Sequence, residues 1–314
     1  MQRLLLTLLF VGFWLSPVQA IDLRLMTGPE FGTYHQVGME ASAAVDASGV
    51  HLQVLPSQGS WENIVALFNS DTELAIFQVD AFVTAAKNLY RNTSININED
   101  IRVVMPLYRE EVHVVKALGK KLDFAGQPDF VVSCGPENSG SCLTAKVLEE
   151  AYGKQFKYVQ ADFQAALDKL RAGAVDLVII TAGKPFPLLV GQSGLELVEL
   201  PRFSQFTEFY SRASLGPKDY PWLKRDVDTY AVRSVLATMI QEQEGLANDL
   251  VGSVHFSLLV NEDRLKRKGH PKWNDVEFIG HVREHSHVGA LRSLSACAAV
   301  RDFGYRCTDL AAEE

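Results

Sequence analysis

The sequence predicts an α/β protein built from two lobes of similar plan. Short apolar runs alternate with helical patterns, an order typical of parallel strands joined by crossover helices. The alternation occurs once before and once after residue 110, and a segment rich in Pro and Gly at 211–228 interrupts it. Of the 314 residues, 47% are hydrophobic and 22% are charged, an ordinary globular mixture in a chain long enough for two lobes.

The first lobe is expected to consist of short strands with helices between them. Ser60 is well placed to cap the second helix, because a hydroxyl at that position accepts a bond from a free N–H of the first turn. The apolar periodicity of the other helical stretches matches one buried helix face. We predict strands at 23–26, 52–55, 74–77 and 103–107, and helices at 33–46, 60–69 and 80–90.

The second lobe is expected to follow the same plan, and the chain then returns to the first lobe. The returning segment contains Gly216-Pro217 and Tyr220-Pro221-Trp222, which break regular structure. A β-like run at 229–235 and a long helical pattern at 244–268 come after it. We predict strands at 130–133, 157–159 and 176–180, and helices at 141–151 and 162–172.

These elements set the predicted domain order and hinges. Hinged closure is expected where one set of elements gives way to the other, near residues 108–114 and 206–213. We predict a leader at 1–20, the first part of lobe 1 at 21–110, lobe 2 at 111–210, and the return segment with the second part of lobe 1 at 211–314.

The N-terminal segment has the features of a secretory signal peptide. Arg3 supplies a positive charge, residues 4–15 form an apolar run, and residues 17–20 end in a small-residue cleavage site after Ala20. About a dozen apolar residues are too few for a membrane anchor, which needs roughly twenty. A lipoprotein would need a cysteine at the cleavage point. We therefore expect a secreted, periplasmic mature chain.

The charge balance disfavours nucleic acid as a partner. Removing Arg3 with the leader takes the formal charge from −8 to −9, whereas phosphate binding draws on clustered Lys and Arg. The one basic run, at 264–268, is more simply the end of a helix, where cations complement the helix dipole.

Four cysteines, Cys134, Cys142, Cys297 and Cys307, are expected to form two disulfides in an exported chain. Three connectivities are possible, and proximity in the sequence favours Cys134 with Cys142 and Cys297 with Cys307. The first bridge would stiffen the loop that it closes.

Four loops that follow predicted strands carry the polar groups of a candidate site. They lie at 27–34, 56–60, 78–80 and 135–141, where open α/β sheets bind ligands and helix N-termini present free N–H groups. One such loop is most often only a turn with its cap. Four in series, drawn from both lobes, favour a binding site, and their neutral donors suit a carboxylate that is held reversibly.

Six ordered motifs resemble the TAXI family of TRAP-transporter solute receptors. They are TGPEFGTYHQVG, SQGSWENI, FQVDAF, MPLYREEVHVV, CGPENSGSCLTA and TAGKP, and the resemblance covers nearly the whole mature chain. The resemblance implies the type II periplasmic-binding-protein fold with a ligand cleft between two lobes. It further implies a glutamate-like or dicarboxylate ligand and a sodium-coupled TRAP-type membrane transporter as the partner.

The resemblance also points to individual ligand-binding residues, of which the loops supply most. Three departures from the family pattern in the first loop, Pro29, Glu30 and Phe31, bear on ligand identity, as does Asn138. Glu30 would oppose a second ligand carboxylate if it faced the cleft. The implied ligand-binding residues are Gly28, Thr33, Tyr34, Ser57, Ser60, Gln78, Asp80, Ser139, Gly140, Ser141, Gly183 and Pro185.

Two alternative functions are an enzyme on the same fold and a periplasmic sensing subunit for a membrane kinase. The sensing subunit remains an alternative, because ligand capture is common to sensing and transport. Gly-x-Ser-x-Gly, the Gly-rich phosphate loops and HExxH are all absent, and nothing in the sequence brings Asp80 and Glu137 together as an acid–base pair. We therefore expect no catalytic residue, no cofactor and a monomer. The histidines His281, His285 and His287 are interpreted as part of a solvated face rather than a metal site.

Overall fold

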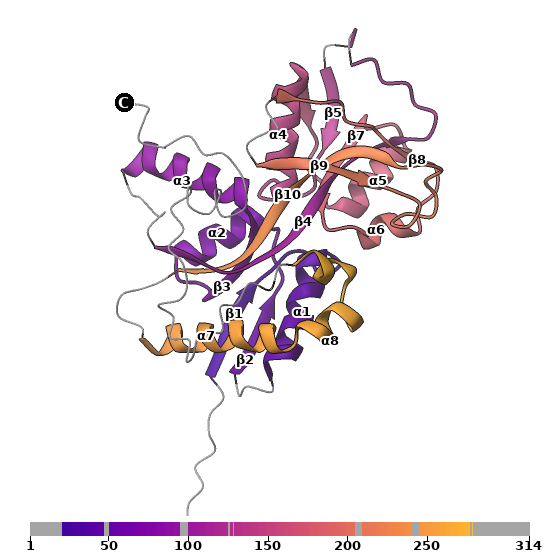
Figure 1. Ribbon diagram of the computed structural model, residues 1–314. Coiled ribbons are helices and arrows are strands. Elements are labelled where there is room, and N and C mark those ends of the chain that lie inside the picture. The colour runs from indigo at the N-terminus through magenta and orange to yellow at the C-terminus, as the bar shows by residue number, and fades with distance from the viewer. Residues whose placement is uncertain are drawn as a thin grey trace, which may run out of the picture.

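Two α/β lobes stand one above the other in the computed structural model of the chain (Figure 1). The structure describes residues 21–46, 50–94, 100–124, 126–127, 129–204, 209–239, 245–276 and 278. The predicted leader, Cys297, Cys307 and the histidines of 281–287 lie outside the described residues. The mixed α/β fold with two lobes agrees with the sequence prediction.

The first lobe begins with parallel strands whose connecting helices cover both faces. Strand β1 (Ile21–Met26) pairs with β2 (Val50–Leu55) on one side and with β3 (Leu74–Gln78) on the other. Every residue of β3 is buried, as expected for a strand covered on both faces. The connecting helices are α1 (Thr33–Val45), α2 (Ser60–Phe68) and α3 (Val79–Thr93).

Two long antiparallel strands pass from the first lobe into the second. Strand β4 (Ile101–Ala117) pairs with β10 (Val227–Met239) from Ile101 opposite Met239 to Glu111 opposite Ala231. The sequence suggested only short strands at 103–107 and 229–235. It also placed the second crossing at 206–213, where the structure instead has part of β9 (Tyr210–Leu215), an edge strand paired with β10. The second crossing is made by β10 itself.

The second lobe repeats the parallel arrangement. Strand β5 (Asp129–Ser133) pairs with β6 (Gln155–Tyr158) and with β7 (Leu177–Ala182), and β7 pairs antiparallel with the far end of β4. Among the described residues the strands form one sheet in the order β2-β1-β3-β10-β4-β7-β5-β6. The remaining elements are α4 (Gly140–Tyr152), α5 (Phe163–Arg171), α6 (Pro187–Val190) and β8 (Leu195–Leu197), which pairs with β4.

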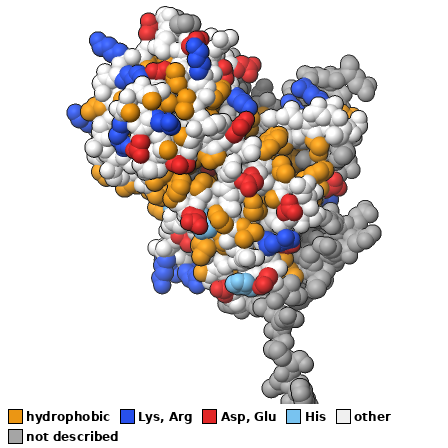
Figure 2. All heavy atoms as spheres, turned by 180° about the vertical axis from the view of Figure 1, so that it is seen from behind, with side chains coloured by type: hydrophobic (Ala, Val, Ile, Leu, Met, Phe, Trp, Pro, Cys, Tyr) orange, Lys and Arg blue, Asp and Glu red, His pale blue; other side chains and the backbone are white. Residues whose placement is uncertain are grey.

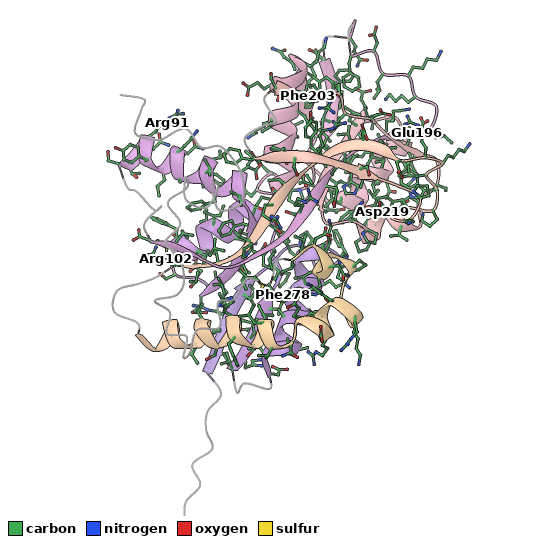
Figure 3. The ribbon with its side chains drawn as sticks, in the orientation of Figure 1. Arg91, Arg102, Glu196, Phe203, Asp219 and Phe278 are labelled. Carbon is green, nitrogen blue, oxygen red and sulfur yellow. A yellow bond between two sulfur atoms is a disulfide. The ribbon has the colours of Figure 1, made fainter. Side chains whose placement is uncertain are left out.

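The C-terminal helices pack against the first lobe, as Figure 1 shows. The long helix predicted at 244–268 is two helices, α7 (Gly245–Val260) and α8 (Glu262–Lys268). Asn261 separates them: its side-chain amide donates to the carbonyls of Ala44 and Ser257. A short 3-10 helix, η4 (Pro271–Asp275), follows and carries the fully buried Trp273, whose ring stacks on Phe278 beside α8 (Figure 3).

The predicted Cys134–Cys142 disulfide is present and joins residues whose Cα atoms are 4.8 Å apart. It closes the loop between β5 and α4. The surface seen in Figure 2 carries acidic and basic side chains interspersed over both lobes rather than one basic field. No helix in the described part of the chain is long and apolar enough to cross a membrane.

Candidate functional site

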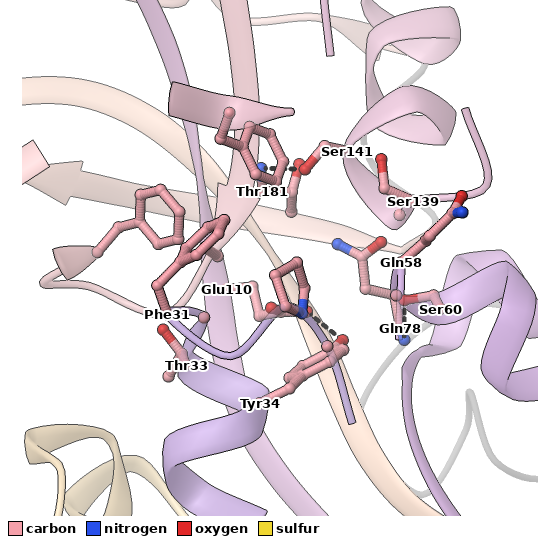
Figure 4. Close-up of a pocket in the computed structure, with 18 residues that line it drawn as sticks. Phe31, Thr33, Tyr34, Gln58, Ser60, Gln78, Glu110, Ser139, Ser141 and Thr181 are labelled. Atoms are coloured by element: carbon pink, nitrogen blue, oxygen red, sulfur yellow. Dashed lines mark hydrogen bonds between the residues drawn. The ribbon is translucent and has the colours of Figure 1, made fainter. Parts of the chain in front are cut away.

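A pocket lies between the two lobes, beside the crossing strand β4 (Figure 4). It holds about 470 Å³ of space not filled by atoms, including the part open to solvent. Loops at the carboxyl ends of the strands supply most of its wall, as expected for an open α/β sheet. The lining residues are Gly28, Pro29, Phe31, Gly32, Thr33, Tyr34, Gln58, Gly59, Ser60, Gln78, Glu110, Ser139, Gly140, Ser141, Phe163, Thr181, Ala182 and Phe186.

Four helices begin at this pocket, three from the first lobe and one from the second. The residues that precede α1, α2, α3 and α4 are Gly32, Gly59, Gln78 and Ser139, and all four line the pocket. No side chain caps the first three helices. The N–H groups of a first helical turn have no partner within the helix, and they carry partial positive charge. The pocket wall is therefore suited to an anion.

Two serine hydroxyls are held in place by backbone N–H groups and keep their own protons for another acceptor. Ser60 Oγ accepts from the N–H of Gln78 at 3.1 Å, and Ser141 Oγ accepts from the N–H of Thr181 at 2.9 Å. Both side chains are buried at the pocket. Their O–H groups can each donate one further bond, to a neighbouring side chain or to a ligand.

Ser139 is engaged within its own loop. Its hydroxyl donates to the carbonyl of Cys134 and accepts from the N–H of Cys142, which caps α4. The disulfide between those two cysteines braces the same turn. Ser139 therefore shapes the pocket wall rather than offering a free donor.

Two buried polar side chains at the pocket have unused hydrogen-bonding capacity. Both amide atoms of Gln78 and the hydroxyl of Thr181 lack a partner in the described part of the chain. A buried polar group without a partner costs about 1 to 3 kcal/mol. Figure 4 shows Gln78 and Thr181 at the space into which Ser141 also points, so a polar ligand there would satisfy both.

The lobes touch at Gly140, the first residue of α4. A Cβ on Gly140 would lie 1.7 Å from Gln78 Oε1 and 2.9 Å from Ser60 Oγ, both on the first lobe. A Cβ on Gly59 would lie 3.6 Å from the Cα of Ser139, an ordinary contact across the interface. This closeness describes a closed arrangement in which a side chain at residue 140 would displace the ends of Gln78 and Ser60.

Thr33 lines the pocket and also joins the lobes, whereas Gly183, Pro185 and Ser57 lie outside the pocket wall. Thr33 donates from its hydroxyl to the carbonyl of Gly183 at 3.0 Å, and so links α1 to the loop after β7. Pro185 lies in that same loop, also outside the pocket wall. Ser57 donates within the first lobe, to the Thr27 carbonyl or to Asn63 Oδ1, and shapes its own loop.

Asp80 lies behind the pocket and bridges the lobes. Its Oδ2 accepts from the Tyr210 hydroxyl at 2.7 Å, and its Oδ1 accepts from the N–H of Ala81. Tyr210 also bonds to Thr144 of α4. Burial raises the pKa of Asp80 to about 6, although the bond from Tyr210 opposes the increase. The carboxylate is therefore a structural contact between α3 and the second lobe.

Glu110 of β4 lines the pocket and was not predicted from the sequence. Its Oε2 accepts from the Tyr34 hydroxyl at 2.6 Å, and the side chain is buried. Burial raises the pKa of Glu110 to about 8. The available signal was an acidic pair, Glu110-Glu111, between two largely apolar stretches of the same strand. Its neighbour Glu111 is neutralised separately, by Lys272 at 2.7 Å.

Three phenylalanines form an apolar wall on another side of the pocket. The ring of Phe186 meets Phe31 edge to face at 6.4 Å and Phe163 at 5.8 Å between centroids. Phe31 comes from the first lobe and the other two from the second, so the wall forms only when the lobes meet. Glu30 beside it is exposed and does not line the pocket.

The described residues offer no place for a metal ion, since they contain no group of three or more His, Cys, Asp or Glu with suitable positions. Among the residues that line the pocket, as far as the structure describes the chain, there is no Lys or Arg. The polar groups of the wall are therefore helix ends, hydroxyls, the side-chain amides of Gln58 and Gln78, and the carboxyl group of Glu110.

Fold and site together define a two-lobe α/β protein with the architecture of periplasmic solute-binding proteins. Residues 25–258 match the NMT1-like family, and the chain belongs to that family. The match runs from β1 to α7 and so includes every residue of the pocket wall.

Solved structures share this architecture at low sequence identity. One described as a periplasmic transporter is 14% identical with a TM-score of 0.52, over 79% of this chain and 85% of the other. A protein from Bordetella bronchiseptica RB50 is 10% identical with a TM-score of 0.51, over 90% of this chain and 98% of the other.

A TctC solute-binding protein from Polaromonas is 17% identical with a TM-score of 0.43, over 79% of this chain and 88% of the other. The names of two of these structures give a role, a periplasmic transporter and a solute-binding protein.

Proposed function

We propose that this chain is a periplasmic solute-binding protein that captures a small carboxylate between its lobes for a TRAP-type membrane transporter. The resemblance to the TAXI family suggests a glutamate-like or dicarboxylate solute. One observation carries the proposal: four helix N-termini, three of them without side-chain caps, begin at one interlobe pocket that also contains an unpartnered buried amide, Gln78.

The chemistry of the wall suits an anion that must be released again. First-turn N–H groups and the Ser141 hydroxyl can donate to carboxylate oxygens, and each such bond to a charged group contributes about 1.5 to 3 kcal/mol. Neutral donors attract a carboxylate without the strong pairing that a buried arginine would give. Nothing in the arrangement calls for a chemical change of the ligand.

Closure and release are attributed to bending of the two crossing strands. The interlobe bonds from Thr33 to Gly183 and from Tyr210 to Asp80 form only in the closed state. Strands β4 and β10 are continuous through both lobes and are the described connections that must bend when the lobes part. The ligand would add its own bonds to both walls and so favour closure.

Export is part of the proposal. The mature chain would begin at Ile21 after removal of the leader, act as a monomer in the periplasm and hand its solute to the membrane subunits. Intact mass of the exported protein tests the first step, and a retained leader would contradict it.

A thermal-shift panel of amino acids, keto acids, dicarboxylates and neutral sugars tests the ligand class. A ligand at a hundred times its dissociation constant stabilises the folded state by about 2.7 kcal/mol. For a chain of this size the melting temperature should rise by about 5 to 10 °C. Shifts with carboxylates alone are expected. Shifts with sugars alone, or recovery of the carboxylate as a product, would refute the proposal.

A further inference from the structure

We propose that Phe31 is a gate at the mouth of the pocket, and that its ring turns away from Phe186 to let a solute enter and leave while the lobes stay together. The inference rests on the proposed function and goes beyond it, because it adds a second route of exchange to the parting of the lobes. It starts from the few residues of the pocket wall that reach solvent.

The pocket opens to solvent along residues of the first lobe. Phe31 is 38% exposed, Gln58 is also exposed and Pro29 is half-buried. The other lining residues, as far as the structure describes the chain, are buried in both lobes. We call these three residues the mouth of the pocket, and a solute that enters the closed arrangement must pass them.

Phe31 connects the mouth to the second lobe. Its ring meets that of Phe186 edge to face, with the centroids 6.4 Å apart and the ring planes at 67°. Gln58 is instead tied to its own helix, since its N–H donates to Glu62 Oε2 at 2.7 Å. Figure 4 shows Phe31 and Gln58 on opposite sides of the pocket. Rotation of Phe31 therefore breaks a contact between the lobes at the mouth.

The second-lobe side of the gate is fixed. Phe186 is 2% exposed, and its N–H donates to the Tyr220 hydroxyl at 2.8 Å. Phe163 meets Phe186 edge to face at 5.8 Å, and it packs so closely on Gly135 that a Cβ there would lie 2.5 Å from its ring. These two rings therefore form a rigid seat against which Phe31 closes.

Phe31 can turn without a change of its backbone. The loop that carries it is a tight turn, in which the N–H of Gly32 donates to the carbonyl of Pro29 at 2.7 Å. Rotation of an exposed side chain takes picoseconds to nanoseconds, whereas collective hinge motion takes microseconds to milliseconds. The ring should therefore leave its seat far more often than the lobes part.

A gate and a simple closed-state contact differ in their effect on rates. A contact that forms after binding slows dissociation alone, so its loss raises the dissociation rate constant and weakens affinity by the same factor. A gate lies on the path in both directions, so its removal raises the association and dissociation rate constants together. An edge-to-face aromatic pair changes an equilibrium by about 2- to 12-fold, which sets the size of either effect.

The experiment measures association and dissociation of radiolabelled glutamate by rapid mixing and filtration, with the mature chain and with Phe31→Ala. If glutamate gives no thermal shift, the radiolabelled form of the panel carboxylate with the largest shift takes its place. We expect Phe31→Ala to raise both rate constants by about 2- to 12-fold and to leave their ratio, the dissociation constant, nearly unchanged. Phe31→Trp, which places a larger ring at the mouth, should lower both rate constants.

Phe68→Ala is the matched control. Phe68 is also a 38% exposed phenylalanine of the first lobe, but it ends α2 and does not line the pocket. Its truncation should leave both rate constants unchanged. Small-angle scattering should show the same compaction with solute in Phe31→Ala as in the unmodified chain, because the gate turns while the lobes stay together.

The outcomes separate this inference from the proposed function. If only the dissociation rate constant increases in Phe31→Ala, or if neither rate constant changes, Phe31 is not a gate and the proposed function stands. A Phe31→Ala chain that stays extended with solute would show that Phe31 clasps the lobes instead of gating the pocket. If no carboxylate of the thermal-shift panel binds to the unmodified chain, the proposed function fails, and this inference fails with it.

Discussion

Gly140→Ala isolates lobe closure from folding. Gly140 is the first residue of α4 and needs no special backbone conformation, so alanine should be accepted within the second lobe itself. Across the interface, however, the added Cβ would lie 1.7 Å from Gln78 Oε1 and 2.5 Å from Gln78 Cδ. The usual separation of such atoms is about 3.5 Å, so Gln78 must move or the lobes must stay apart.

The magnitude follows from overpacking. Forcing an extra carbon into a closely packed contact typically costs about 1 to 3 kcal/mol. Because the contact exists only in the closed state, this cost falls on ligand binding rather than on the unliganded fold. We expect affinity for the carboxylate to decrease by about 5- to 150-fold. The melting temperature without ligand should remain close to that of the unmodified chain.

The assay combines calorimetry with small-angle scattering in the presence and absence of ligand. Unmodified chain should become more compact at saturation, whereas Gly140→Ala should remain extended. Gly191→Ala is the matched control, since nothing lies within 4 Å of its added Cβ. Normal affinity and normal compaction in Gly140→Ala would show that Gln78 moves aside, and would refute the claim that the contact at residue 140 limits closure.

Three further predictions concern stability. The pKa of Asp80 is raised from 3.8 to about 6, so the folded state binds the proton more tightly than the unfolded state, and about 3 kcal/mol of stability should be lost as pH increases from 4 to 6. Asp80→Asn should remove that loss in urea denaturation. An unchanged pH profile in the variant would show that Asp80 is not the titrating group. Lys272→Met should destabilise the chain by about 3 to 5 kcal/mol because it leaves Glu111 buried without its cation, and adding Glu111→Gln should restore most of this in the same assay; equal loss in the double variant would argue against the pair. Opening the Cys134–Cys142 bridge with Cys142→Ser should lower the free energy of unfolding, measured by denaturant titration, by about 2.5 kcal/mol or less. A ligand affinity that stays normal in this variant would show that the bridge does not shape the pocket.

The order of elements could be predicted because local patterns determine it. The helix starts at Thr33 and Ser60 agree with the predicted bounds, and β3 was recognisable as a short apolar run. The predicted capping role of Ser60 is wrong, because Gly59 occupies the N-cap of α2 and no side chain caps that helix. Residues of the four strand-to-helix loops line one pocket, since strand ends meet at one edge of an open sheet, and their role in binding stays a prediction.

Long-range features were not predictable in the same way. The lengths of β4 and β10 depend on pairing with each other and with β7 and β9, which no local pattern reports. Phe163 and Phe186 resembled ordinary core residues, and only the approach of Phe31 from the other lobe makes them a wall. Glu110 is held at the pocket by the hydroxyl of Tyr34, a contact between residues far apart in the sequence that no local pattern reports. Gly183 accepts the interlobe bond from Thr33, and Pro185 lies in the same loop. Neither residue lines the pocket.

The most direct test of the central claim is amide hydrogen exchange with residue resolution, in the absence and presence of saturating glutamate. If helix N-termini hold the ligand carboxylate between the lobes, the first-turn amides of α1, α2, α3 and α4 should become the most strongly protected. Protection confined to other surfaces, with these amides exchanging at the same rate in both states, would contradict the account.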